Sequence, residues 1–478
     1  MIFSSIPFLF FFFPVFLLLY YLVPFKHKNL ILLIFSLVFY AWGEPIYITL
    51  MIFSSVVDYV NGLMIEKHKD NKKIKNIFMV ASVIINLSLL GFFKYADFLI
   101  NSINNVFNTT IPLLKLGLPI GISFFTFQTM SYSIDVYRGE VKAEKNFLTF
   151  MTYVSMFPQL IAGPIVRYET VSQELHEREI NFKHFSNGLL RFMQGLFKKV
   201  LIANTVGYLW SVMSTNPNIS VLGAWLGIIA YSFQIYFDFS GYSDMAIGMG
   251  KMLGFNYLEN FNYPYIAKSI TDFWRRWHIS LSTWFRDYVY VPLGGSRVKK
   301  IINIRNIFVV WMLTGLWHGA SWNFVLWGMY YGILLLLEKF VLKKYIDKLP
   351  NVLKHLYTII LVIIGWLIFA FEDTNMLISY AKTMFGLNGE FINSTFIYYF
   401  TNYFIIMVIA TIFSMPVYQK IEDILKNGKH NNIKFILTLI YNFFILVISL
   451  KKNVNSFFHF SNKYVRFPNL DNFHLQIF

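Results

Sequence analysis

Long apolar runs alternate with short polar segments along almost the whole chain. A helix needs about 20 apolar residues to cross a membrane. The candidate spans are residues 2–23, 30–43, 46–64, 77–96, 147–165, 221–247, 305–319, 321–341, 355–371, 396–415 and 433–450. Gly, Pro or charged residues interrupt three further stretches, 112–136, 184–207 and 270–293, as is typical of re-entrant or interfacial helices. The pattern predicts an all-α polytopic membrane protein with about ten to twelve transmembrane or re-entrant helices.

The distribution of basic residues predicts the orientation. Basic segments, namely 26–28, 67–75, 268–305, 339–354 and 420–434, are expected in the cytoplasm, whereas 43–45 and 101–110 hold no Lys or Arg and are expected outside. The first run has no basic residue before it and no small-x-small cleavage site, which favours an uncleaved first helix. We see no internal repeat and expect one domain over 1–450. The tail 451–478 has no assigned role: parity places it outside, yet it is basic.

The amino-acid composition supports a membrane protein and excludes several types of functional site. Of 478 residues, 56% are hydrophobic and 14% are charged, against about 25% charged in soluble domains. The absence of Cys excludes disulfides, thiol nucleophiles and Cys-ligated metals. A net charge of +16 on a membrane protein predicts contact with anionic lipids, and no nucleic acid partner is expected.

Ionisable residues at membrane depth are expensive and therefore informative. Asp238 and Asp244 lie within the run 221–247. They are about 240° apart around a helix, so a straight helix cannot point both inward. Gly241 between them could bend it. The carboxylates either anchor neighbouring helices or a nearby basic residue, or take part directly in chemistry.

The stretch 270–293 combines aromatic and basic residues. Helical spacing places on one face Trp274, Trp277, Leu281, Trp284 and Tyr288. Thr271 and Asp272 are candidate N-caps. Three arginines make the stretch too charged to span: Arg275, Arg276 and Arg286. It is either an interfacial helix or, as the turn 292–295 favours, a re-entrant element that lines a cavity.

Two other clusters break the apolar pattern. His318 lies between two apolar runs, and Gly319 beside it allows another group to approach closely. His318 either donates a hydrogen bond to a backbone carbonyl or has a function. Gly328 and Gly332 form a G-x-x-x-G motif that favours helix packing. Prolines and Gly163 interrupt 157–167, which predicts either a cavity or a kink.

His278 and His318 are the residues in these clusters that titrate near neutrality. Metal-ligand spacing, a phosphate-binding loop and a serine-nucleophile motif are not found near them, so no metal site is expected. A histidine that desolvation keeps neutral can act as a general base on a hydroxyl. The alkoxide would attack an activated carbonyl such as a thioester. Acyl transfer of this kind needs neither metal nor Cys.

Several motifs resemble the membrane-bound O-acyltransferases, above all the bacterial alginate O-acetyltransferases and related polysaccharide or peptidoglycan acetylating proteins. The motifs are residues 124–139, 159–167, 238–244, 272–295 and 316–319, and the resemblance covers about 1–450. It does not extend to 451–478, which lack the usual short aromatic ending. Teichoic acid D-alanyl transferases are similar over the His278 segment, but the turn Pro292-Leu-Gly-Gly295 favours the acetylating branch.

The resemblance implies a helical bundle around a central tunnel, with His318 as the catalytic histidine and His278 as a second, supporting catalytic position. It implies a cytoplasmic acyl donor, acetyl-CoA, with no tightly bound cofactor. Expected partners are a polysaccharide acceptor and a secreted or membrane-anchored acetyltransferase- or esterase-like protein, at the cytoplasmic (inner) membrane. Candidate donor- or substrate-binding residues are Arg275, Arg276, Ser282, Arg286, Asp238, Asp244, Gln128 and Gln159.

Three alternatives stay open at this point: D-alanyl transfer to teichoic acid, a glycan transporter or flippase, and a non-catalytic scaffold of a secretion complex. Transporters commonly contain inverted repeats, which we do not find. The identity of the acceptor, and direct or relayed transfer, are not determined by the sequence.

Overall fold

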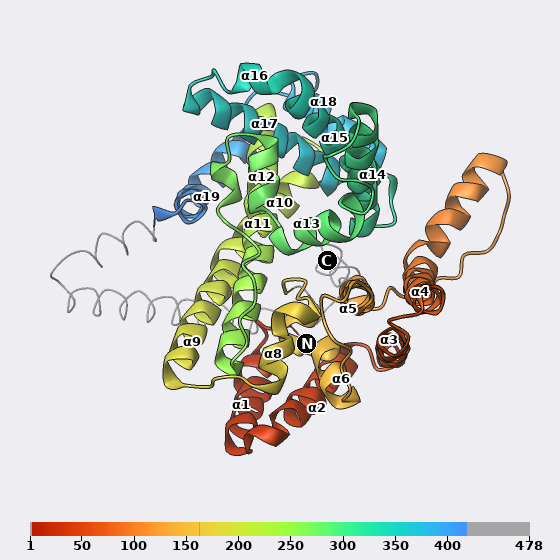
Figure 1. Cartoon of the computed structure of the whole chain (residues 1–478). Helices are drawn as coiled ribbons and strands as arrows, with labels where there is room; N and C mark the ends of the chain where they lie inside the picture. Colours follow the sequence, from red (N-terminus) through yellow and green to blue (C-terminus); the bar gives the residue numbers. More distant parts are fainter. Residues whose placement is uncertain (1, 162, 418–478) are drawn as a thin grey trace. The chain divides into compact units, whose positions relative to one another are not determined.

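The computed structural model describes residues 2–161 and 163–417, and within them every regular element is a helix (Figure 1). The first elements are η1 (Phe8–Phe12), α1 (Phe13–Leu22), α2 (Phe25–Gly43), α3 (Ile48–Lys67), α4 (Lys72–Phe107), α5 (Ile122–Arg138), α6 (Phe147–Ser155), α7 (Phe157–Leu160), α8 (Tyr168–His176) and α9 (Phe182–Phe197). Then follow η2 (Lys198–Ala203), α10 (Asn204–Ser214), α11 (Val221–Leu253), η3 (Pro264–Ile266), α12 (Ile270–Arg276), α13 (Ile279–Phe285) and η4 (Arg286–Tyr290). The last are α14 (Lys300–His318), α15 (Trp322–Leu337), η5 (Glu338–Leu342), α16 (Lys343–Ile346), α17 (Asn351–Ala370), α18 (Thr374–Met384) and α19 (Ser394–Phe413).

Six helices in the described part of the chain are long and apolar enough to cross a membrane. They are α3, α4, α11, the segment Trp322–Ile346, α17 and α19; Phe8–Leu22 is a shorter apolar helix. The prediction of an all-α polytopic membrane protein is therefore confirmed. The predicted span 433–450 and the tail 451–478 lie outside the described residues.

Some of the predicted segments differ from the structure. The run 147–165 is not one span, because the chain leaves helical geometry at Met156 and Pro158 lies in the first turn of the short α7. A proline has no N–H to continue a preceding helix, which accounts for the break. In 112–136 the helix begins only at Ile122. Gly241 does not break the helix, since α11 passes through that residue without interruption.

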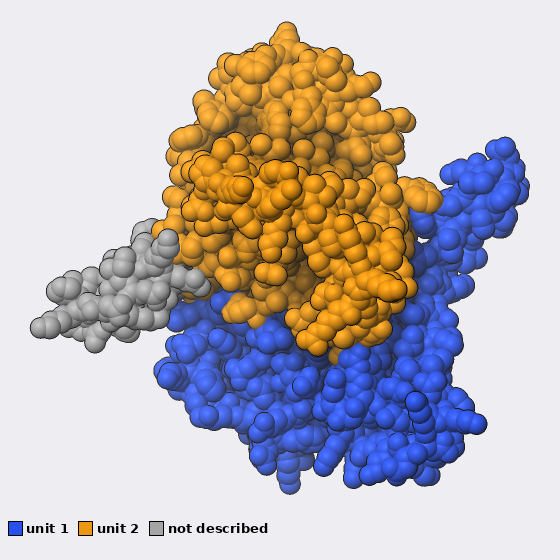
Figure 2. Space-filling view, turned by 45° about the horizontal axis from the view of Figure 1, so that its top comes forward, with its two compact units in different colours: residues 1–192, 245–258, 478 blue, residues 193–244, 259–477 orange. Residues whose placement is uncertain are grey.

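The chain divides into two compact units (Figure 2). Of the described residues, unit 1 holds 2–192 and 245–258, and unit 2 holds 193–244 and 259–417. In unit 1, the buried Asp58 on α3 accepts hydrogen bonds from Ser82 and Asn86 on α4 and from Ser133 on α5. This carboxylate cross-links three helices, and hydrogen bonds among Ser54, Asn86 and Thr129 add a second buried polar contact between them.

In unit 2, helices α14 and α15 cross with their backbones in close contact. A Cβ atom at Gly315 would lie 2.3 Å from the Phe324 carbonyl oxygen, and one at Gly328 would lie 2.4 Å from that of Trp311. A Cβ at Gly332 would lie 3.3 Å from the Cβ of Trp311. Glycine is required at Gly315 and Gly328 because any side chain there would separate the helices. The predicted packing role of the G-x-x-x-G motif, which contains Gly328, is therefore confirmed. The close crossing sets the position of His318, the last residue of α14.

Candidate active site

The predicted aromatic helix is broken at its centre by His278. Helix α12 ends at Arg276, α13 begins at Ile279, and His278 between them has φ 44° and ψ 56°, in the left-handed region. A single continuous helix was therefore a wrong prediction. The backbone of a neighbouring segment takes the place of helical hydrogen bonds here. The N–H of Ile279 donates to the carbonyl of Asn260 and the N–H of Asn262 donates to that of Arg276, both at 2.9 Å.

The start of α12 also differs from the prediction. Its N-cap is Ser269, whose hydroxyl oxygen accepts from the N–H of Asp272 at 3.0 Å. The buried Glu338 carboxylate accepts the N–H groups of Ile270 and Thr271 at 2.6 and 2.9 Å. Thr271 and Asp272 are thus not the caps, because a serine one turn earlier and a distant carboxylate satisfy the free N–H groups.

A cavity of about 830 Å³ in unit 2 is lined by both predicted catalytic histidines. Its lining also includes three predicted donor-binding residues, Arg275, Ser282 and Arg286. The remaining charged residues of the lining are Glu338, Lys339, Lys343 and Asp347, and its indole rings are Trp274, Trp277 and Trp311. The segment 270–293 therefore lines a cavity, as the re-entrant interpretation expects. No three His, Asp or Glu side chains in 2–161 and 163–417 cluster as metal ligands would.

His278 is almost completely buried, with 1% of its surface exposed. Its Nδ1 lies 3.2 Å from Asn260 Oδ1, and the Phe239 ring contacts the imidazole edge-on with a centroid separation of 4.7 Å. Burial lowers the pKa of His278 well below its usual range, and the nearby His318 lowers that pKa further. His278 lies outside the candidate spans. The lowered pKa favours the neutral form of the His278 ring.

His318 is held by an aromatic cage at the end of α14. Its ring lies 4.9 Å from that of Trp327, 5.2 Å from that of Phe369 and 5.1 Å from that of Trp317, measured between centroids. Trp317 also contacts His278 at 5.8 Å. A Cβ at Gly319 would lie 2.1 Å from the Phe324 ring. The group that the absence of a side chain at Gly319 allows to approach is therefore the phenyl ring of Phe324. The cage limits the rotamers of His318, which stays partly exposed where it lines the cavity.

The other predicted binding residues do not line this cavity. Arg276 pairs with Asp272 at 2.9 Å. Asp238 forms an ion pair with Lys199, and Asp244 with Lys198 at 2.6 Å. The anchoring interpretation of the two aspartates thus agrees with their contacts, with consecutive lysines of the π-helix η2 as partners.

Two predicted binding residues, Gln128 and Gln159, belong to unit 1. Both are fully buried. The side-chain amide of Gln159 donates to the Tyr153 carbonyl at 2.6 Å. This contact stays within the interrupted segment 147–165 and gives Gln159 a local structural role.

Sequence reasoning missed four residues of the site: Asn260, Glu338, Lys339 and Lys343. Lys339 and Lys343 lie at the start of the basic stretch 339–354, which the distribution of basic residues predicts to be cytoplasmic. This basic stretch was the one sequence feature that could have indicated the two lysines. Asn260 and Glu338 act on residues 18 and 68 positions away. No local pattern reveals such contacts.

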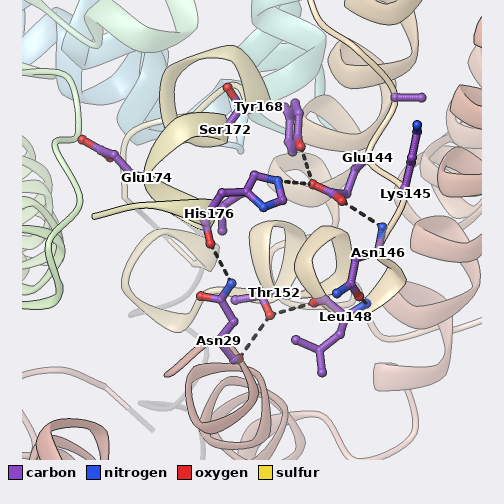
Figure 3. Close-up of polar contacts among 12 residues, drawn as sticks. Asn29, Glu144, Lys145, Asn146, Leu148, Thr152, Tyr168, Ser172, Glu174 and His176 are labelled. Atoms are coloured by element: carbon purple, nitrogen blue, oxygen red, sulfur yellow. Dashed lines mark hydrogen bonds and ion pairs between the residues drawn. The ribbon is translucent and has the colours of Figure 1, made fainter. Parts of the chain in front are cut away.

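A second polar cluster, in unit 1, centres on the buried Glu144 (Figure 3). Its carboxylate accepts from the Tyr168 hydroxyl at 2.7 Å and from the Asn146 N–H at 2.8 Å, and lies 2.8 Å from His176 Nε2. Tyr168 and His176 are the two ends of α8. The cluster fixes the segment between α5 and α6 against α8, which is a structural role.

Comparison with known proteins shows where this arrangement belongs. Residues 141–381 match the family model of the membrane-bound O-acyltransferases, and the matched segment contains the whole cavity lining. The chain belongs to this family. A Pseudomonas aeruginosa protein named "Probable alginate O-acetylase AlgI" is 44% identical over 81% of this chain and 75% of its own length. The peptidoglycan O-acetyltransferase of Helicobacter pylori is 37% identical over 81% of this chain and 80% of its own.

The teichoic acid D-alanyltransferase of Bacillus subtilis is 31% identical over 45% of this chain and 58% of its own length. Family membership and these relatives make the chain a multi-pass membrane O-acyltransferase, most similar here to O-acetyltransferases. An enzyme therefore replaces the transporter and scaffold alternatives.

Proposed function

We propose that this O-acyltransferase lies in the cytoplasmic membrane and transfers an acetyl group from acetyl-CoA to a hydroxyl of an extracellular or cell-wall polysaccharide. The observation that carries the proposal is one cavity lined by the buried His278 and by His318, together with four cationic side chains. The match to acetylating relatives covers 81% of the chain, against 45% for the D-alanyl transferase, which favours acetyl over D-alanyl as the acyl group.

His318 is the general base in this proposal. It accepts the proton of the acceptor hydroxyl while that oxygen attacks the thioester carbonyl. The C–S bond then breaks, and the thiolate leaves with the proton that His318 returns. The products are an acetyl ester and a free thiol, so His318 ends the cycle neutral. The acceptor hydroxyl belongs either to the polysaccharide or to a secreted or membrane-anchored partner that passes the acetyl group on.

The cationic residues of the cavity support a phosphate-bearing donor. Arg286 is already paired with Asp287 at 2.6 Å, and Lys339 donates to Asn303 at 2.7 Å. Arg275 and Lys343 are exposed at the cavity and are the better candidates to bind the phosphates of CoA. Both lie in stretches that the charge distribution predicts to be cytoplasmic, where the donor is expected.

The test is acetyl transfer by the purified protein in lipid nanodiscs, with labelled acetyl-CoA and an acetyl-free polysaccharide. His318→Ala should abolish thioester consumption while the protein stays at normal membrane abundance. His278→Ala should lower the rate by a factor of about 10²–10⁴. His27→Ala removes an exposed histidine in unit 1 and is the matched control.

Unchanged acetyl transfer in His318→Ala would remove that residue from the mechanism. Activity with a D-alanyl thioester, and none with acetyl-CoA, would favour the D-alanyl branch. Loss of activity in the His27→Ala control would show that the assay reports stability instead of chemistry.

A further inference from the structure

One buried amide oxygen organises the surroundings of His278. Asn260 lies between α11 and η3, and none of its surface is exposed. Its Oδ1 accepts from the backbone N–H of Ser280 at 3.1 Å and from the Ser280 hydroxyl at 2.9 Å. The same oxygen lies 3.2 Å from His278 Nδ1.

These contacts favour one tautomer of His278, because the Ser280 hydroxyl, 3.5 Å from Nδ1, donates its proton to Asn260 Oδ1. A backbone N–H can only donate, so the Asn260 atom that faces Ser280 must be the carbonyl oxygen and not the amide nitrogen. An amide oxygen can only accept, so Nδ1 of His278 must carry the ring proton for the contact to be a hydrogen bond. Nε2 then holds a lone pair. It has no hydrogen-bond partner among the residues that the structure describes.

Asn260 also holds the backbone conformation that orients this ring. Its carbonyl accepts the N–H of Ile279, the residue directly after His278. His278 has a positive φ, which residues other than glycine rarely adopt, so surrounding contacts must maintain it. The side chain and the main chain of Asn260 therefore act together on one imidazole that lines the cavity.

We propose that Asn260 is a positioning residue for acyl transfer: it holds His278 in the Nδ1–H tautomer, so that the Nε2 lone pair is available beside His318. The chemical part rests on the function proposed above. When His318 takes the hydroxyl proton it becomes positively charged, and a neutral acceptor nearby stabilises that charge. If His278 carried a proton on Nε2, or a positive charge, it would instead disfavour the positive charge on His318. The tautomer thus favours an accepting role for His278 over polarisation of the thioester carbonyl.

Charged groups near His278 come from several elements and must stay unchanged in any test. His318 on α14 acts on it directly. The other charged residues of the cavity are Arg275, Arg286, Glu338, Lys339, Lys343 and Asp347. On α11, which contributes Phe239 to the ring's surroundings, Asp238 and Asp244 are paired with lysines.

The first experiment observes the tautomer without substrate. The protein is labelled with ¹⁵N-histidine in nanodiscs, and the His278 signals are assigned by their loss in His278→Gln. We expect a protonated Nδ1 and an unprotonated Nε2 at neutral pH. A protonated Nε2 would overturn the proposal. This readout does not depend on any activity, so it decides the tautomer even if acetyl transfer by the protein is not found.

The second experiment is kinetic and uses two charge-matched variants. Asn260→Asp keeps an acceptor oxygen for Ser280 and His278, but its carboxylate should raise the pKa of His278 by about 1–3 pH units. The acid side of the kcat profile should therefore move to higher pH. Asn262→Asp adds the same charge two residues away on an exposed side chain and should leave the profile unchanged.

Asn260→Ala should lower kcat by about 10–100-fold with KM within about twofold, because the tautomer is lost but the cavity wall remains. A wild-type pH profile in Asn260→Asp, or an equal shift in both Asp variants, would overturn the proposal. Size-exclusion profiles identify a variant that has failed to fold, in which case the ¹⁵N spectrum of the wild-type protein decides.

Discussion

Substitution of glycine by alanine at three helical positions tests whether the close crossing of α14 and α15 sets the site geometry. At Gly315 the new Cβ would lie 2.3 Å from the Phe324 carbonyl oxygen and 3.2 Å from the Gly328 Cα. Both neighbours are backbone atoms that cannot rotate away. At Gly332 the nearest atom is 3.3 Å away, and at Gly91 on α4 no atom lies within 4 Å. The three positions therefore form a graded series.

The expected magnitudes follow from these distances. To restore normal van der Waals contact at Gly315, the two helices must separate by about 1 Å. Overpacking of this kind typically costs about 1–3 kcal/mol, partly offset by the higher helix propensity of alanine, worth about 1 kcal/mol. At Gly91 only the propensity gain applies. The order of stability should be Gly91→Ala, then Gly332→Ala, then Gly315→Ala as the least stable variant.

The assay is thermal unfolding in detergent, followed by fluorescence-detected size exclusion, together with acetyl transfer. Because His318 follows Gly315 by three residues and contacts Trp327 of α15, Gly315→Ala should also lose activity at temperatures where it remains folded. Equal stability and activity of the Gly315 and Gly91 variants would refute the reasoning.

Two further predictions concern charges. Lys199→Met leaves the buried Asp238 without its partner and should destabilise the protein by about 3–5 kcal/mol. Combining Lys199→Met with Asp238→Asn should regain most of that loss. Equal instability of the single and double variants would contradict the ion pair. The pKa of His278 is lowered in the folded protein, so below about pH 6.5 the unfolded chain binds a proton that the folded protein does not. The free energy of unfolding should therefore fall as the pH decreases below about 6.5, by up to about 1.4 kcal/mol per pH unit. Unfolding measured from pH 7.5 to 5 should show a smaller slope in His278→Gln, and identical slopes would contradict the burial of a neutral ring.

The sequence by itself determined the class of protein and most of the helical segments, and it indicated His278 and His318 as candidate site residues. Hydropathy and helix length are local properties, so runs such as 46–64 and 355–371 predict α3 and α17 directly. The histidines are recognisable because an ionisable residue between apolar runs is costly unless it has a role.

Only the tertiary structure decided how those histidines are held. The break at His278 depends on Asn260, and the start of α12 depends on Glu338, each through hydrogen bonds across long sequence separations. The partners of Asp238 and Asp244 are likewise set by the packing of η2 against α11. Hydrogen bonds and ion pairs between distant segments depend on which elements meet in space, and hydrophobic periodicity carries no information about that choice.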